Sequence, residues 1–162
     1  LARQRVAEHA QDVTLWQDAL GALARIAPGI DPARDTQQAA GVTVRRWAEP
    51  FAETPPADVV VEAFGCGLPP ACLDSMAAVS PPPCWINLEY LSAESWAEDC
   101  HGMASPHPSL PLVRYFYFPG FSPASGGLLR EHGLLAARAA ARQSVCTSKS
   151  MRTRWRLLRS CS

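Results

Sequence analysis

Hydrophobic and polar residues repeat with two different periods in the first third of the chain. Apolar residues at helical spacing predict a helix over residues 19–26, with Asp18 at the position of its N-cap. Residues 2–9 are typical of the end of another helix. Short apolar or alternating runs predict strands over residues 13–16 and 42–47. Helix and strand therefore alternate from the start.

A continuous apolar run followed by glycines marks the middle of the chain. Residues 59–64 read Val-Val-Val-Glu-Ala-Phe and lead into Gly65-Cys66-Gly67. Such a run is typical of a parallel strand that is buried on both faces. A proline pair then fits the first turn of a helix over residues 71–78. Comparable runs predict two further strands, over residues 84–91 and 115–118, with a long proline-containing loop between them. A last helix is predicted over residues 128–142.

Strands that alternate with helices predict an α/β protein with a Rossmann-like parallel sheet. Ligands of such sheets bind at the carboxyl ends of the strands, which here carry residues 62–67, 89–94 and 119–121. The chain has neither a Gly-x-Gly-x-x-Gly sequence after a strand nor a Walker A sequence. A generic nucleotide-binding or redox domain of Rossmann type is therefore kept only as an alternative.

The composition is that of one folded domain with a hydrophobic core. The chain has 162 residues, of which 48% are hydrophobic and 19% are charged. No apolar run reaches the roughly 18 residues of a membrane span, and charged residues interrupt the first segment, which argues against a signal peptide. The formal net charge of +0 argues against a general nucleic-acid binder. We expect a cytoplasmic protein with no membrane or nucleic-acid partner.

The zero net charge conceals an asymmetry. Residues 144–162 hold five basic residues and no acidic one, so residues 1–143 carry ten basic against fifteen acidic residues. Residues 47–113 contain nine acidic residues and no Lys or Arg. This acidic stretch is either an ordinary solvated surface or a face that attracts a cationic partner.

The six cysteines do not form the pattern of a disulfide framework, because they are scattered over a chain large enough for its own core. Cys66 and Cys84 lie in or beside apolar runs, which predicts buried free thiols. Cys100, His101 and His107 lack the paired spacing of zinc ligands. We therefore expect no metal and no cofactor.

Polar residues are concentrated where the strand at residues 84–91 ends. The sequence there includes Asn87, Glu89, Tyr90, Ser92 and Glu94. Polar groups at the end of a buried strand are costly unless they form hydrogen bonds or bind a ligand. This segment is therefore either a ligand site or the capping sequence of a following helix.

Several long strings identify a family. They include Trp-Ile-Asn-Leu-Glu-Tyr-Leu-Ser-Ala-Glu and Phe-Tyr-Phe-Pro-Gly-Phe, and the full set lies at residues 45–51, 62–66, 85–94, 100–102, 105–108, 116–121 and 126–129. Together they strongly resemble the protein-arginine rhamnosyltransferase family (EarP). The resemblance covers about residues 1–142 in order and without large gaps.

The resemblance implies a GT-B glycosyltransferase with two Rossmann-like halves. The family is inverting and moves L-rhamnose from dTDP-β-L-rhamnose to one arginine of translation elongation factor P. The C-terminal half holds the nucleotide sugar and the N-terminal half docks the acceptor protein. By this resemblance, the chain is an incomplete N-terminal half.

The acceptor chemistry gives the polar segment a role. A guanidinium group stays protonated, so an enzyme must bind it with carboxylates, orient one nitrogen and accept a proton. On this basis, Glu89 and Glu94 are the predicted acceptor-binding carboxylates, supported by Asn87, Tyr90 and Ser92.

The resemblance also implies what this polypeptide lacks. The family's general-base aspartate lies in a loop whose counterpart would precede residue 1, and the donor half would follow residue 143. We expect residues 1–143 to be a partial acceptor-binding domain without its first strand, and residues 144–162 to be a disordered or frameshifted basic tail. No residue inherits the catalytic role, so we expect the 162-residue chain to be inactive. A module that only docks elongation factor P is the alternative.

Overall fold

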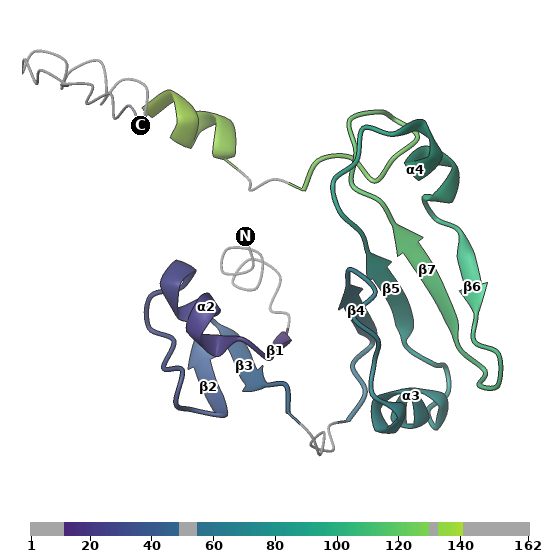
Figure 1. Ribbon diagram of the computed structural model, residues 1–162, viewed down its shortest axis with the longest axis horizontal. Coiled ribbons are helices and arrows are strands. Elements are labelled where there is room, and N and C mark those ends of the chain that lie inside the picture. Colours follow the sequence, from purple (N-terminus) through teal and green to yellow (C-terminus); the bar gives the residue numbers. More distant parts are fainter. Residues whose placement is uncertain (1–11, 49–54, 130–132, 141–162) are drawn as a thin grey trace, which may run out of the picture. The chain divides into compact units, whose positions relative to one another are not determined.

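The structure, a computed structural model, describes residues 12–48, 55–129 and 133–140 (Figure 1). The chain divides into two compact units, Leu1–Leu129 and Arg130–Ser162. The predicted helix at residues 2–9 and the predicted tail at residues 144–162 lie outside the described residues. In the second unit, residues 134–140 are helical, within the range predicted from the sequence.

A small mixed sheet occupies the first described segment. It consists of β1 (Thr14–Gln17), β2 (Thr36–Ala39) and β3 (Val42–Arg46) in the order β1-β3-β2. Strands β1 and β3 are parallel, and β2 is antiparallel to β3. Helix α2 (Leu20–Ile26) follows β1. These elements bury a core of Leu20, Ile30, Val42 and Val44.

Strand β2 was not predicted from the sequence. Its residues read Thr-Gln-Gln-Ala, which shows no apolar alternation. The strand forms because a two-residue turn reverses the chain into β3. Ala40 and Gly41 both have positive φ, 55° and 80°, as the preferred hairpin turn requires.

A second mixed sheet contains the segment that the sequence singled out. Strands β4 (Val59–Ala63), β5 (Cys84–Leu88) and β7 (Val113–Tyr117) are parallel, and β6 (Ala104–Pro106) is antiparallel to β7. The order is β4-β5-β7-β6, with β5 and β7 in the centre (Figure 1). The prediction of an α/β protein is therefore confirmed.

Helix α3 (Pro70–Ala77) connects β4 to β5, and its apolar residues pack against Val60 and Trp85 of this sheet. Pro70 lies in its first turn, as predicted. Met76 of the helix, Trp85 of β5 and Leu112 form the buried core, and partly buried apolar residues surround them. Removal of these side chains from water stabilises the unit.

Two sequence predictions about this sheet were wrong. The sheet is mixed and not all parallel, because the predicted proline loop contains helix α4 (Ser95–Cys100) and the antiparallel strand β6. Strand β4 is not buried on both faces: Val59 and Val61 are 52% and 56% exposed. They lie on the sheet face opposite α3, since Val60 between them packs into the core beneath that helix.

The expectation of buried thiols at Cys66 and Cys84 was also wrong, since both residues are exposed. Cys84 begins β5, and its side chain shares the uncovered sheet face with Val59, its partner in register. Cys66 lies in the loop after β4. No helix in the described residues is both long and apolar enough to cross a membrane.

Candidate functional site

The carboxyl ends of the three parallel strands meet at one edge of the second sheet, as the sequence predicted. The segments that follow the strands stay hydrogen-bonded side by side. The Phe64 amide donates to the Leu88 carbonyl at 2.8 Å, and the Glu89 amide donates to the Tyr117 carbonyl at 2.9 Å. Residues 64–67 and 87–94 are therefore held close together at this edge.

Asn87 is the buried centre of this edge. It is only 1% exposed. Its Oδ1 accepts a hydrogen bond from the Gly65 amide at 3.0 Å, and its Nδ2 donates to Oε1 of Glu89 at 2.6 Å. The side-chain amide thus uses both of its ends, because a buried polar group without partners would be costly. Asn87 holds the turn after β4 and orients the Glu89 carboxylate.

Tyr90 and Phe64 complete the same edge. Their rings stack with centroids 4.0 Å apart and planes 10° apart, and the side chains remain 67% and 49% exposed. Phe64 has a φ of 58°, the left-handed region that residues other than glycine rarely occupy. We call Phe64, Asn87, Glu89, Tyr90 and Glu94 the strand-end site.

Ser92 and Glu94 lie where the chain turns into α4. The Ser92 hydroxyl accepts a hydrogen bond from the Glu94 amide at 3.1 Å, and the helix begins at Ser95. The helix-capping alternative for this segment is not confirmed for Ser92, because the N-cap residue is Glu94 and α4 has no side-chain cap hydrogen bond. The Glu94 side chain is exposed and makes no hydrogen bond or ion pair to another described residue. Its carboxylate is therefore open to a ligand.

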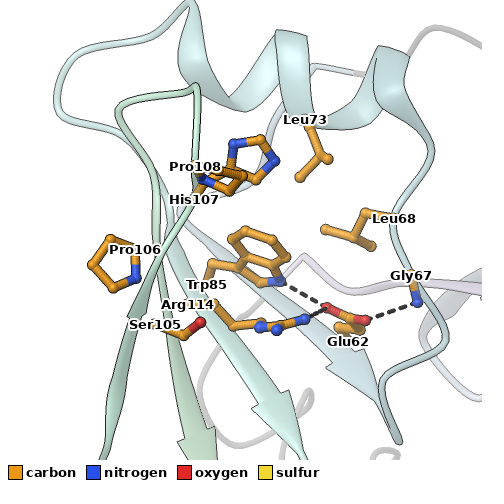
Figure 2. Close-up of a pocket in the computed structure, with 10 residues that line it drawn as sticks. All are labelled: Glu62, Gly67, Leu68, Leu73, Trp85, Ser105, Pro106, His107, Pro108 and Arg114. Atoms are coloured by element: carbon orange, nitrogen blue, oxygen red, sulfur yellow. Dashed lines mark hydrogen bonds and ion pairs between the residues drawn. The ribbon is translucent and has the colours of Figure 1, made fainter.

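Glu62 is a buried carboxylate in the second sheet. The sequence located it only within residues 62–67 at the end of a strand and gave it no role. Its side chain is fully buried, beside Asn87 in register. Oε1 accepts from the Gly67 amide at 2.8 Å, and Oε2 accepts from Trp85 Nε1 at 3.2 Å and lies 3.6 Å from Nη1 of Arg114 (Figure 2). An acid inside an apolar run was the available signal, since a buried carboxylate needs such partners.

A hollow of about 240 Å³ lies over Trp85 on the α3 side of the sheet, and we call it the Trp85 hollow (Figure 2). Its lining includes Glu62, His107 and Arg114 but no residue of the strand-end site. The Arg114 guanidinium lies over the Trp85 ring at 5.3 Å and pairs with Glu62. The two charges neutralise each other, so little charge is left for a ligand.

The histidines considered as metal ligands hold loops instead. His101 Nδ1 accepts from the Phe118 amide at 3.1 Å, and His107 Nδ1 accepts from the Leu110 amide at 3.1 Å. Within residues 12–48, 55–129 and 133–140, no three His, Cys, Asp or Glu side chains are grouped as a metal would require. Cys100 is a free, half-buried thiol at the end of α4.

Fold and site together define an α/β protein whose sheet edge presents a fixed carboxylate, an exposed carboxylate and two stacked rings. Residues 1–160 match the model of the family described as Elongation-Factor P (EF-P) rhamnosyltransferase EarP. The chain belongs to this family.

Curated relatives agree with this assignment. The chain is 51% identical over 145 residues to the protein-arginine rhamnosyltransferase of Pseudomonas putida and 50% identical over 145 residues to that of Pseudomonas aeruginosa. It is 41% identical over 149 residues to the protein of the same name from Shewanella oneidensis. These matches cover 88–90% of this chain but 38% of each relative. The chain therefore spans less than half the length of these relatives.

Proposed function

We propose that the protein to which this chain corresponds transfers L-rhamnose from dTDP-β-L-rhamnose to an arginine of elongation factor P, with inversion at the anomeric carbon. The proposal is supported by membership of a family whose model bears the name of this activity. We further propose a GT-B architecture, of which the described residues form part of the acceptor half, and a cytoplasmic place of action, since the acceptor is a translation factor.

The observation that carries the acceptor role is the Glu89 carboxylate, fixed at 2.6 Å by the buried Asn87. A guanidinium is planar and always charged, and its N–H groups match the two oxygens of a carboxylate. Glu89 has one oxygen left without a hydrogen bond among the described residues, and Glu94 nearby in sequence is exposed. The strand-end site thus offers a cation a preorganised partner.

The chemical step places a further demand on the enzyme. One guanidinium nitrogen attacks the anomeric carbon as the bond to the nucleotide breaks, and a base takes up the proton that this nitrogen loses. We propose that the strand-end site binds and orients the acceptor and that the base lies outside the described residues. The 162-residue chain alone is accordingly proposed to transfer no rhamnose, and a product of arginine rhamnosylation by the purified chain would contradict this.

The test uses a hybrid transferase, which is the Pseudomonas putida relative with its matching segment replaced by this chain, after the hybrid has been found active. We expect Glu89→Gln to lower kcat/KM for elongation factor P about 30-fold, because a hydrogen bond to a charged group contributes on the order of 2 kcal/mol. The KM for dTDP-β-L-rhamnose stays unchanged.

The matched control is Glu98→Gln, an exposed glutamate in α4 outside the strand-end site. It leaves both kinetic parameters as they are. An unchanged acceptor kcat/KM in Glu89→Gln would remove the acceptor role from this residue.

Docking without catalysis is the second candidate for this chain taken alone. It is favoured by the position of all five predicted acceptor residues within the described part of one unit. Capture of elongation factor P by the purified chain, without any donor-binding partner half, would support it.

A further inference from the structure

Two exposed aromatic rings at the strand-end site have no role in the hydrophobic core. Phe64 follows β4 and Tyr90 follows β5, and their rings stack at 4.0 Å. Neither residue belongs to the two core clusters of the described chain. Large aromatic side chains that stay exposed as a pair are typical of binding surfaces.

The backbone under Phe64 indicates that the side chain itself is required. A φ of 58° is unfavourable for phenylalanine and costs nothing for glycine. Two buried polar side chains hold this conformation, since Asn87 binds the Gly65 amide and Glu62 binds the Gly67 amide. If only the shape of the turn mattered, glycine would adopt it without strain. We therefore infer that the exposed phenyl ring is the reason for phenylalanine at this position.

The charge around the rings selects the kind of ligand. Glu89 directly precedes Tyr90, and Glu94 is exposed in the same segment. No Lys or Arg occurs from residue 48 to residue 113. A phosphate-bearing nucleotide would be repelled by this surface, whereas a planar cation would be attracted to the carboxylate at its edge and to the rings at its face.

Resting on the proposed function, we propose that Phe64 and Tyr90 form the stacking surface for the guanidinium of the acceptor arginine, while Glu89 binds its edge. A guanidinium can do both at once, because its N–H groups lie in the plane and its faces are free. A lysine ammonium has no such face. The ring pair is therefore a determinant of arginine over lysine.

The experiment measures the affinity of the full 162-residue chain for elongation factor P by calorimetry. The acceptor is used as such and with its target arginine changed to lysine or to alanine. We expect Tyr90→Leu and Phe64→Leu to weaken binding of the unchanged acceptor about fivefold to tenfold, the range of a cation on an aromatic face. Tyr90→Phe keeps the ring and stays within about twofold.

The alanine form of the acceptor isolates the guanidinium, since it binds the original chain and Tyr90→Leu equally well if the inference holds. Tyr115→Leu is the control, because Tyr115 is also an exposed tyrosine, 44% exposed, on β7. Equal losses by Tyr90→Leu toward the arginine and alanine acceptors would assign the rings to general docking and overturn the inference. So would binding of dTDP-β-L-rhamnose that Tyr90→Leu abolishes.

Failure of the two proposals can be told apart. Absence of any binding of elongation factor P by the unchanged chain would count against the acceptor role of the whole site, and with it against the ring pair. Binding that Glu89→Gln weakens but that both leucine variants leave intact would keep the acceptor role of Glu89 and remove the ring pair alone.

Discussion

The strand-end site and the Trp85 hollow both depend on a buried polar residue, and these two residues are neighbours in register, Asn87 and Glu62. In the hollow, the Glu62 carboxylate is fully engaged, since Trp85 and the Gly67 amide donate to it and Arg114 lies beside it, whereas Nε of Arg114 is buried without a hydrogen-bond partner among the described residues. At the strand end, Nδ2 of Asn87 donates a hydrogen bond to Oε1 of Glu89, and the Glu89 side chain is only half-buried. The carboxylate in the hollow has no oxygen left for a ligand, whereas the sheet edge leaves carboxylate oxygens of Glu89 and Glu94 available.

The difference shows that, in this chain, a concave surface is a weaker sign of function than a carboxylate oxygen without a partner. A buried carboxylate whose two oxygens are both engaged, as those of Glu62 are, has a structural role. A carboxylate that is anchored on one oxygen and open on the other is preorganised for a ligand, because its orientation entropy is already lost before binding. The following substitutions test whether the two regions differ in this way.

The largest effect is expected from Glu62→Leu in the Trp85 hollow. It removes the partner of Arg114, whose side chain is 29% exposed, and leaves the Gly67 amide without its acceptor. Loss of one member of a buried pair typically costs about 3 kcal/mol or more, and urea unfolding of the chain would measure it. Glu98→Leu, on the exposed face of α4, should cost less than about 1 kcal/mol. If Glu62→Leu lowered the free energy of unfolding by as little as Glu98→Leu does, the contacts of Glu62 in the hollow would not stabilise the fold.

A smaller loss of stability is expected from Asn87→Ala at the strand end. The Gly65 amide would lose its acceptor and Glu89 its anchor. An unsatisfied buried group costs about 2 kcal/mol, and the proposed function predicts that the freed Glu89 also binds elongation factor P more weakly. Gln38→Ala removes an exposed amide that binds Thr43 in the first sheet, and should change neither quantity beyond about 0.5 kcal/mol. Loss of stability with full acceptor affinity in Asn87→Ala would separate Asn87 from the site.

The smallest effect concerns two thiols that flank the two regions. Cys66 lies exposed in the strand-end turn, and Cys72 packs against the core under α3, where burial raises the pKa of its thiol. At a pH below that raised pKa, a smaller fraction of Cys72 is in the reactive thiolate form than would be the case for an exposed thiol with the ordinary pKa. Maleimide labelling followed by peptide mass mapping should therefore modify Cys66 before Cys72, with the difference shrinking as pH rises. Equal rates at neutral pH would mean that α3 opens readily.

Much of the second sheet could be predicted from the sequence because its elements are continuous apolar runs bounded by proline or glycine. Strands β4, β5 and β7 carry such runs, helix α3 is marked by the proline pair at its start, and each was found within a few residues of its predicted place. Strands β2 and β6 were missed, and helix α4 was considered only as the alternative to a ligand site. They are short and mostly polar, and pairing or packing with neighbours stabilises them more than local propensity does.

The predicted site was recovered unevenly for a similar reason. The sequence located the polar segment with Asn87, Glu89, Tyr90, Ser92 and Glu94, because polar residues at the end of a buried strand are conspicuous. It did not pair Tyr90 with Phe64, which lies 26 positions earlier in the chain. That contact depends on the parallel register of β4 and β5, in which Ala63 lies opposite Leu88.

The order of residues alone was therefore enough to establish the family, the α/β class and the acidic segment at the end of β5, because each is a local pattern or a long string. Only the tertiary structure decided which acidic residue is available. Glu62 and Glu89 both follow or interrupt apolar runs, yet Glu62 is enclosed by Arg114 and Trp85 while Glu89 keeps an open oxygen. The physical reason is that solvation and charge compensation are set by neighbours in space, and those neighbours come from distant strands.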